Sequence, residues 1–272
     1  MIRPKSEPAR GVLRIEPGDT SRHRHARYHP SPDLAPFVEH YWVVEWDLRG
    51  VPPVAVATLP HPSVHVIFER DAGGRVAGVA RGRFSRELSG IGGVVAAKFK
   101  PGGFRPFLDR DVSALTDRTL PVADVFGAAS ETASQAILAA PGDDDRVRGI
   151  ETFLRSREPV ADPVIDEIAS LVYAAAGDRA LLTVDDLAAR AGRPLRALQR
   201  LFAKYVGVSP KWVIQRYRLH EAAERIAADP ALDQVELALS LGYADQAHFV
   251  RDFKAMVGMP PGAYARRTTW PT

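Results

Sequence analysis

The stretch LALSLGYADQAHFVRDF, residues 237–253, contains two short helical patterns separated by a Gly-Tyr pair. The first pattern places apolar residues at helical spacing: Leu237, Ala238 and Leu241. The second keeps its large apolar side chains on one face: Phe249, Phe253 and Met256. Its polar side chains point away from that face: Gln246, His248 and Arg251. Because a glycine between two short helices supplies a tight turn, we predict a helix-turn-helix here.

The same pattern occurs about fifty residues earlier in the chain. At an offset of fifty, Leu187, Ala188 and Gly192 match Leu237, Ala238 and Gly242. After the glycine the offset is fifty-one, and the matching residues of the earlier copy are Arg200, Phe202, Val206, Gly207 and Pro210. Their partners in the later copy are Arg251, Phe253, Val257, Gly258 and Pro261. A one-residue insertion beside a turn glycine is easily accommodated, so we predict a duplicated helix-turn-helix.

Each unit starts with a capping pattern, Thr183 to Asp186 in the first and Asp233 to Glu236 in the second. In the first unit the helix after the turn has a buried face at helical spacing: Leu198, Leu201, Phe202 and Tyr205. Arg and Gln on its other face suit base recognition, because Arg pairs with guanine and Gln with adenine. The predicted DNA-binding residues of the first unit are Arg196, Gln199, Arg200 and Lys204.

The second unit presents polar residues in the first turn of the corresponding helix, the part that enters a major groove. Its predicted DNA-binding residues are Gln246, Ala247, His248, Val250, Arg251 and Lys254. Residues 211–228 lie between the units and are predicted as one helix. At ~1.5 Å per residue it is roughly 27 Å long, near the ~34 Å between successive major-groove faces. Such a helix lets one chain reach two adjacent grooves, although a core helix of a bundle has the same pattern.

Basic residues are concentrated around the first unit. The chain has 36 Lys and Arg against 33 Asp and Glu, a net charge of +3. Residues 182–220 contain eight basic and two acidic residues, whereas residues 221–272 contain five basic and seven acidic ones. A local basic patch suits a polyanion, but a solvated surface has the same composition. The correspondence of Arg200 with Arg251 in two similar units favours DNA.

The composition excludes several classes of protein. The absence of cysteine excludes disulfides, thiolate metal sites and DNA repair that needs a cysteine acceptor. The longest apolar runs, such as 94–97 and 171–176, are much shorter than the ~18 residues of a membrane span. The N-terminal sequence MIRPKSEPAR has no apolar signal segment. We therefore expect a cytoplasmic protein with no membrane partner and no cofactor.

The expected fold class is α+β, in three parts. Residues 1–33 are predicted to form a flexible arm. Residues 34–158 are predicted as a β-rich sensor or dimerisation domain with trailing helices at 130–139 and 146–154. The proline-containing linker SREPVADP, residues 156–163, contains the boundary, and residues 159–272 are predicted as an all-helical DNA-binding domain.

His61, His65 and Glu69 are the one candidate metal set of the front half, since their spacing places them on one face of a strand. Pro62 interrupts a regular strand, and the lining of a core or pocket explains these residues equally well. We predict neither a metal nor catalytic residues; a metal-dependent cupin-like enzyme or sensor joined to a DNA-binding tail is the alternative. Aromatic residues instead indicate an apolar pocket for a small-molecule effector: Tyr41, Trp42, Trp46, Phe68, Phe99, Phe104 and Phe107.

Residues 184–267 resemble the double helix-turn-helix domain of AraC/XylS-type transcriptional regulators. The resemblance rests on LAARAG, LQRLFAKYVGVSP, RLHEAAERI and LALSLGYADQAHFVRDFKAMVGMPPGAYAR. It implies base contacts by Arg196, Gln199 and Arg200, and in the second unit by residues 246–248, Val250 and Arg251. Family members often have Ser where this chain has Pro194 and Ala244, so a hydroxyl for phosphate is lost twice. Proline is acceptable at a first helical position, and Asp245 can cap in place of Ala244.

The front half is similar to the sensor-side domain of some actinobacterial-type members, a likeness that implies no defined ligand. It rests on LAPFVEHYWVVEWDLRG, LPHPSVHVIFE and KFKPGGFRPFLDRDVSALTDRTLPVADVFG. We therefore expect a sequence-specific transcription regulator that reads two adjacent major-groove segments. The expected partners are double-stranded DNA, a small-molecule effector, a second copy in a homodimer, and RNA polymerase if the protein is an activator. A stand-alone architectural DNA-binding protein is disfavoured, because the front half has a core of its own.

Overall fold

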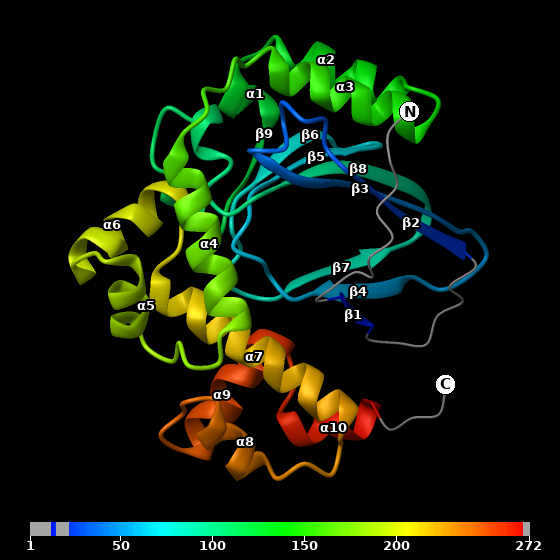
Figure 1. Ribbon diagram of the computed structural model, residues 1–272. Helices are drawn as coiled ribbons and strands as arrows, with labels where there is room; N and C mark the ends of the chain where they lie inside the picture. Colours follow the sequence, from blue (N-terminus) through cyan, green and yellow to red (C-terminus); the bar gives the residue numbers. More distant parts are fainter. Residues whose placement is uncertain (1–11, 15–21, 269–272) are drawn as a thin grey trace.

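The structure is a computed structural model that describes residues 12–14 and 22–268. A β-rich part with three helices comes first, and seven further helices follow from Pro163 onward (Figure 1). We call the β-rich part, from β1 to the end of α3 at Arg155, the front domain. The arrangement confirms the expected α+β class. Among the described residues, no helix is both long and apolar enough to span a bilayer.

Two antiparallel sheets form the front domain. The larger sheet has the strand order β2 (His23–Tyr28), β3 (Val38–Leu48), β8 (Gly90–Phe99), β5 (His65–Glu69), β6 (Gly73–Ala77) and β9 (Thr119–Pro121). The smaller sheet has the order β1 (Val12–Arg14), β4 (Val54–Thr58) and β7 (Phe84–Leu88). Figure 1 shows the small sheet opposite one face of the large sheet, while helices cover the other face.

The helix-covered face of the large sheet is apolar and buried. Alternate residues of its central strands point to this side: Tyr41, Val43, Val66, Phe68, Val95, Ala97 and Phe99. Three helices follow the sheet: α1 (Val122–Phe126), α2 (Ser130–Ala139) and α3 (Asp143–Arg155). Most of the aromatic residues expected to line a pocket therefore fill the core, because they lie on the strand face that the helices cover.

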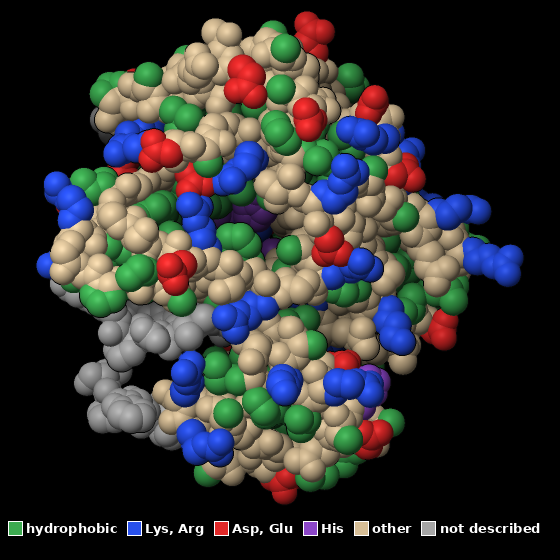
Figure 2. All heavy atoms as spheres, turned by 180° about the vertical axis from the view of Figure 1, so that it is seen from behind, with side chains coloured by type: hydrophobic (Ala, Val, Ile, Leu, Met, Phe, Trp, Pro, Cys, Tyr) green, Lys and Arg blue, Asp and Glu red, His purple; other side chains and the backbone are tan. Residues whose placement is uncertain are grey.

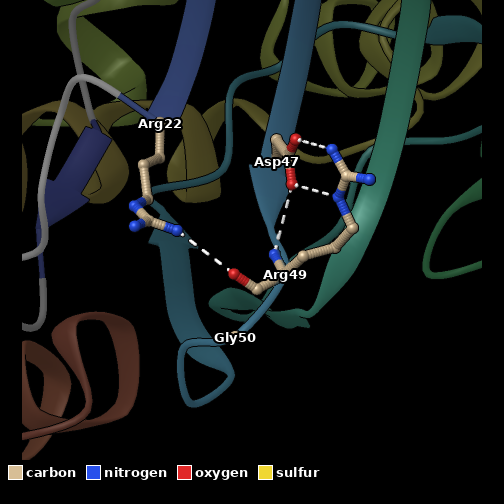
Figure 3. A pocket seen from close by; sticks show the side chains of 4 residues that line it. All are labelled: Arg22, Asp47, Arg49 and Gly50. Carbon is tan, nitrogen blue, oxygen red and sulfur yellow. Dashed lines mark hydrogen bonds and ion pairs between the residues drawn. The ribbon is translucent and has the colours of Figure 1, made fainter.

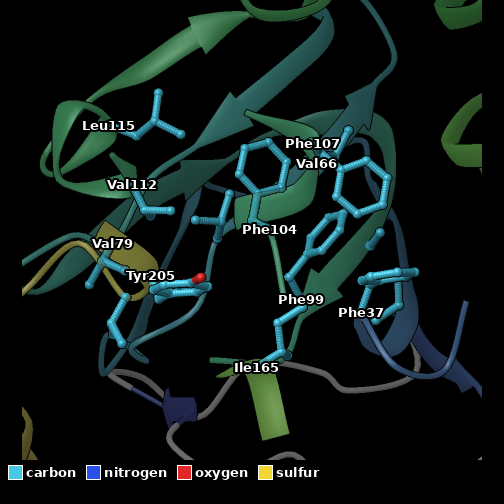
Figure 4. Packing of buried hydrophobic residues seen from close by; sticks show 14 of the residues in the cluster. Phe37, Val66, Val79, Phe99, Phe104, Phe107, Val112, Leu115, Ile165 and Tyr205 are labelled. Carbon is cyan, nitrogen blue, oxygen red and sulfur yellow. The ribbon is translucent and has the colours of Figure 1, made fainter. Parts of the chain in front are cut away.

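Aromatic rings extend this core towards the helical part of the chain. The ring centroids of Phe99 and Phe104 are 4.9 Å apart, and those of Phe99 and Phe107 are 5.3 Å apart. Phe107 ends the short 3-10 helix η2 (Arg105–Phe107), and a second one, η3 (Val112–Leu115), follows. Figure 4 shows Ile165 and Tyr205 from the helical part packed into the same cluster. The front domain and the first helical unit thus share one continuous core.

The helical part contains two helix pairs joined by a long helix. Its elements are α4 (Pro163–Gly177), α5 (Val184–Ala191), α6 (Leu195–Tyr205), α7 (Pro210–Ala228), α8 (Gln234–Ser240), α9 (Gln246–Val257) and α10 (Pro261–Thr268). A second core lies between α7 and the last three helices, and Leu59 of the front domain is buried in it. The predicted boundary at 158/159 falls in the loop between α3 and α4.

The flexible arm predicted over 1–33 is wrong for residues 23–28, which form β2. This strand pairs along β3, from His23 opposite Trp46 to Tyr28 opposite Tyr41. Arg24 strengthens the edge through ion pairs of 2.7 Å to Glu45 and 2.6 Å to Asp143. Residues 1–11 and 15–21 of the predicted arm lie outside the described residues.

Candidate nucleic-acid interface

The first helix-turn-helix unit consists of α5 and α6, and its start and turn follow from three residues. The Thr183 hydroxyl accepts a hydrogen bond from the Asp186 amide at 3.1 Å, and the Asp186 carboxylate accepts one from the Thr183 amide at 2.8 Å. This reciprocal capping box is the predicted one. Gly192 ends α5 with φ of +60°, a left-handed conformation that glycine adopts without steric cost. The turn then leads directly into α6.

The predicted contact residues of α6 lie on its exposed face. Leu198, Phe202 and Tyr205 are buried, whereas the four predicted DNA-binding residues are exposed: Arg196, Gln199, Arg200 and Lys204. Within the described part of the chain, the side chains of Arg196, Gln199 and Arg200 have no hydrogen-bond or ion-pair partner. The Lys204 ammonium lies 5.3 Å from the centre of the Tyr205 ring. Figure 2 shows Lys and Arg side chains projecting from the edge of the molecule at α5 and α6.

Pro194, the residue before α6, does not occupy the helical position predicted for it. Pro194 was expected at the first helical position, but it is the N-cap, with extended backbone (ψ 143°) and no side-chain cap. The helix begins one residue later, at Leu195. Proline still suits this position, because its fixed φ of about −65° agrees with the observed −57°.

The second unit consists of α8 and α9, each capped by an aspartate. Asp233 accepts hydrogen bonds from the amides of Val235 at 2.7 Å and Glu236 at 3.2 Å. Asp245 accepts one from the His248 amide at 2.7 Å, so it caps α9 as expected from the sequence. Gly242 connects the two helices with φ of +80°. Both units therefore have the predicted helix-turn-helix geometry.

On α9, Phe249, Phe253 and Met256 are buried, and four predicted contact residues are exposed: Gln246, Ala247, Arg251 and Lys254. His248 is 41% exposed and lies 3.2 Å from the Asp252 carboxylate. Val250 is partly buried against the second core, so it does not lie freely on the exposed face as predicted. It follows Phe249 and precedes Phe253 by three residues, which turns its side chain towards the core.

Two arginines that the sequence did not single out hold the units in place. Arg193, in the turn before α6, makes a paired contact with Glu167 of α4 at 2.6 and 2.8 Å. Arg218 of α7 is 3% exposed, and it donates to the carbonyl oxygens of Asp178 at 2.9 Å and Leu181 at 2.6 Å. The only sequence signal for Arg218 is a charged residue beside the apolar stripe of a long helix.

The front domain contacts both units. The Thr116 hydroxyl donates to the Gly207 carbonyl at 2.6 Å, just after α6. Arg83, before β7, donates to the Val257 carbonyl at 3.2 Å, at the end of α9. Leu59 is 2% exposed within the core of the second unit. The two recognition helices are thus positioned by the front domain as well as by α7.

The three residues of the candidate metal set, His61, His65 and Glu69, do not come together. His61 precedes β5, and its ring packs against that of His220 at 5.6 Å. His65 accepts a hydrogen bond from the Trp42 indole at 3.3 Å, and Glu69 is ion-paired with two arginines, Arg75 and Arg86. Over residues 12–14 and 22–268, no three His, Asp or Glu side chains form a group that could hold a metal ion. These contacts give each member of the set a separate structural role.

An open depression lies at the connection between β3 and β4, and Figure 3 shows the residues that line it. The Arg49 guanidinium donates to the Asp47 carboxylate at 2.6 and 2.9 Å. Arg22 donates to the Arg49 carbonyl at 3.2 Å. Because these charges satisfy one another at the surface, the depression offers no group dedicated to a ligand.

Comparisons with known proteins agree with this geometry. Residues 187–267 match a family described as "Helix-turn-helix domain", and residues 26–121 match a "Domain of unknown function (DUF6597)". The transcriptional activator AarP of Providencia stuartii is 31% identical over 113 residues, which cover 42% of this chain and 82% of AarP. A putative AraC-like transcription regulator of Streptomyces lividans is 34% identical over 89 residues, 33% of this chain and 29% of that protein. The matched segment thus spans less than a third of this second relative.

Among solved structures, ToxT from Vibrio cholerae aligns over 92% of this chain and 100% of its own, with 11% identity and a TM-score of 0.38. The two helix-turn-helix units and the match that covers 82% of AarP are sufficient to assign the chain to a family. The chain belongs to the AraC/XylS family of helix-turn-helix transcriptional regulators.

Proposed function

We propose that this regulator binds a specific double-stranded DNA site in the cytoplasm by placing α6 and α9 in two successive major grooves. The observation that carries the proposal is the position of two exposed polar helix faces at opposite ends of one long helix, α7. Their 10 predicted contact residues are mostly exposed, and three on α6 have no partner within the described chain. Side chains that are free of internal contacts can be used for base edges without first breaking an ion pair.

The two faces differ in charge, which suggests different roles. The α6 face has Arg196, Arg200 and Lys204 without an acidic neighbour on the same face. On α9, Asp252 lies 3.2 Å from His248 and 3.7 Å from Arg251. An acidic group beside the recognition side chains weakens attraction to phosphate. We infer that α6 supplies most of the electrostatic affinity and that α9 adds base discrimination.

We also propose that the front domain regulates this activity through a small-molecule effector or a second copy of the chain, and not through catalysis. Its contacts with Gly207, Val257 and the second core support this proposal, because they connect it to both units. An effector acts only if it favours one arrangement of these parts over another. If the protein is an activator, RNA polymerase is the further partner.

Selection of bound fragments from random DNA, followed by binding measurements on the selected site, tests the DNA proposal. Arg200→Ala and Arg251→Ala are each expected to cost about 1–3 kcal/mol on that site and to relax one base position. The two relaxed positions are expected about 10 bp apart. Arg148→Ala on α3, far from both units along the chain, is the control and leaves binding unchanged. Equal weakening on all sequences would show that these arginines contact phosphate and not bases.

A further inference from the structure

The front domain contacts the same place in both helix-turn-helix units. Gly207 and Gly258 are equivalent residues of the duplication, at an offset of fifty-one, and each comes within two residues of the end of a recognition helix. Their backbone conformations agree, with φ of +93° and +92°. The Thr116 hydroxyl donates to the Gly207 carbonyl at 2.6 Å. Arg83 donates at 3.2 Å to the carbonyl of Val257, the residue before Gly258. The carboxyl-terminal ends of α6 and α9 are therefore both attached to the front domain.

These two contacts come from two segments of the front domain that lie side by side. The first arm, residues 78–83, connects β6 with β7, and the second arm, residues 115–118, leads from the end of η3 to β9. The Asp117 amide donates to the Val79 carbonyl at 3.0 Å. This backbone pairing continues the pairing of β6 with β9. The two arms therefore leave the edge of the large sheet together.

Asp117 joins the arms beyond the backbone pairing. Its carboxylate accepts a hydrogen bond from the Arg81 amide at 2.7 Å and another from the Arg81 guanidinium at 2.6 Å. Asp117 has φ of +58°, a left-handed conformation in which aspartate is enriched. Arg81 lies two residues before Arg83, which contacts the end of α9. Asp117 directly follows Thr116, which contacts the end of α6. One carboxylate thus connects the two contacts.

The two helix-turn-helix units pack in different cores, so a connection between them affects their relative position. Residues of α5 and α6 belong to the core that continues from the front domain, whereas residues of α8 and α9 belong to the second core. The helix α7 has 19 residues and contributes to both cores. Long helices curve readily, and a bend in α7 moves α9 relative to α6 unless a second connection bridges them.

We propose that the two arms form a brace that fixes the separation of α6 and α9, with Asp117 as the residue that joins them. This proposal rests on the proposed binding of DNA by both helices, and it adds a determinant of specificity that does not touch DNA. Each base pair inserted between two recognised segments moves one of them by about 3.4 Å and rotates it by about 35°. A braced pair of helices accepts one spacing of these segments, and an unbraced pair accepts several.

Binding of the full-length chain to its selected DNA site tests the brace, when the site is also lengthened and shortened by one base pair between the two recognised segments. The unsubstituted chain is expected to bind the altered sites at least about tenfold more weakly than the selected site. Asp117→Gly removes both contacts with Arg81 and suits the left-handed backbone. In this variant the affinity ratio between selected and altered sites is expected to fall by at least about threefold. The base preference within each segment is expected to stay the same.

Asp47→Ala is the matched control. The Asp47 carboxylate accepts hydrogen bonds from the Arg49 amide at 3.2 Å and from the Arg49 guanidinium at 2.6 and 2.9 Å, so the variant loses contacts of the same kind. These residues lie at the connection between β3 and β4, which Figure 1 shows on the side of the front domain opposite α5 and α6. The affinity ratio is expected to be unchanged in this variant. An equal fall in Asp47→Ala would overturn the proposal.

The two ends of the brace are tested by Arg83→Ala and Thr116→Val, each of which detaches one recognition helix. Because the contacts act in series, either substitution is expected to lower the affinity ratio as much as Asp117→Gly does. The double variant is expected to lower it no further, which is a non-additive result. Additive losses would show that the two contacts act separately, and they would overturn the brace.

The separation of α6 and α9 is also measurable without DNA, since the chain contains no cysteine. Spin labels attached to Gln199→Cys and Lys254→Cys report the distribution of distances between these two exposed positions. The distribution is expected to be narrow in the labelled chain and in Asp47→Ala, and broader in Asp117→Gly. Equal widths in all three would overturn the proposal. If Arg200→Ala and Arg251→Ala leave base preference unchanged, the DNA proposal fails, whereas the label distances still decide whether the brace exists.

Discussion

The guanidinium of Arg83 donates a hydrogen bond of 3.2 Å to the carbonyl oxygen of Val257, the last residue of α9. Gly258 follows with φ of +92°, and the Arg83 guanidinium occupies the place where a Cβ would lie. One arginine of the front domain thus fixes the end of the second recognition helix, and glycine alone leaves room for it.

Gly258→Ala is expected to lower the free energy of unfolding by more than the roughly 1–2 kcal/mol cost of a left-handed alanine. The additional loss comes from crowding against Arg83. Urea unfolding of Gly258→Ala, Arg83→Ala and the double variant separates the two effects. In the Arg83→Ala background, Gly258→Ala is expected to lower the free energy of unfolding only by the cost of the left-handed backbone conformation. An equal cost in both backgrounds would show that Arg83 moves aside freely.

The capping box of the first unit is expected to contribute about 1 kcal/mol. Thr183→Ala removes the hydroxyl that accepts from the Asp186 amide, whereas Thr183→Ser keeps it. Urea unfolding is expected to show the loss in the alanine variant and little change in the serine variant. A similar loss in both would assign the effect to the methyl group and not to the cap.

Stability is expected to decrease between pH 7.5 and 5.5 because of two histidines of the large sheet. Burial lowers the pKa of His65 to about 3 and also lowers the pKa of His40. The unfolded chain binds protons below its ordinary His pKa of ~6.5 and the folded chain does not, so acid favours unfolding. For His65 alone the loss over this range is about 1 kcal/mol.

His65→Gln provides the test, since glutamine has an acceptor for the Trp42 indole but does not titrate. The difference in unfolding free energy between pH 7.5 and 5.5 is expected to be smaller in this variant by about 1 kcal/mol. The charges of Lys98, His40 and Glu39 also affect the pKa of His65, so these three residues are not substituted in the comparison. A pH dependence identical to that of the unsubstituted chain would contradict the assignment to His65.

The salt dependence of DNA binding is expected to be governed by α6. Lys204→Ala is expected to reduce the slope of log K against log salt by about 0.9, the value for one lost phosphate contact. Lys254→Ala on α9 is expected to reduce it less, because residues 221–272 carry an acidic excess. The measurement is a titration of the selected DNA site at several salt concentrations. A larger change for Lys254 would reverse the roles proposed for the two helices.

Arg218, on α7, is expected to stabilise the fold through its buried guanidinium. Arg218→Met removes hydrogen bonds to the carbonyl oxygens of Asp178 and Leu181, which are held by that guanidinium. It is expected to destabilise the fold by about 1–3 kcal/mol in urea unfolding. A neutral result would indicate that other donors reach these carbonyls.

The helix-turn-helix units were predictable because local chemistry specifies them. Capping by Thr183 and Asp245, the left-handed turn at Gly192 and the buried stripe through Phe202 each depend on a few neighbouring residues. The strand at 23–28 was not predictable in the same way. Its sequence, HRHARY, is polar on both faces, and only pairing along β3 and the contact of Arg24 with Asp143 make it a strand.

The sequence alone determined the α+β order, the duplication of the helix pair, and which residues of α6 face outward, because helical periodicity separates a buried face from an exposed one. Only the tertiary structure decided that Glu69 pairs with arginines, that most of the front aromatics fill a core, and that Arg216 is buried without a hydrogen-bond partner among the described residues. Those outcomes depend on which strand face the helices cover and on which strands and helices lie side by side in the folded chain. The periodicity of apolar residues predicts which residues are buried, but it does not identify the residues that they pack against.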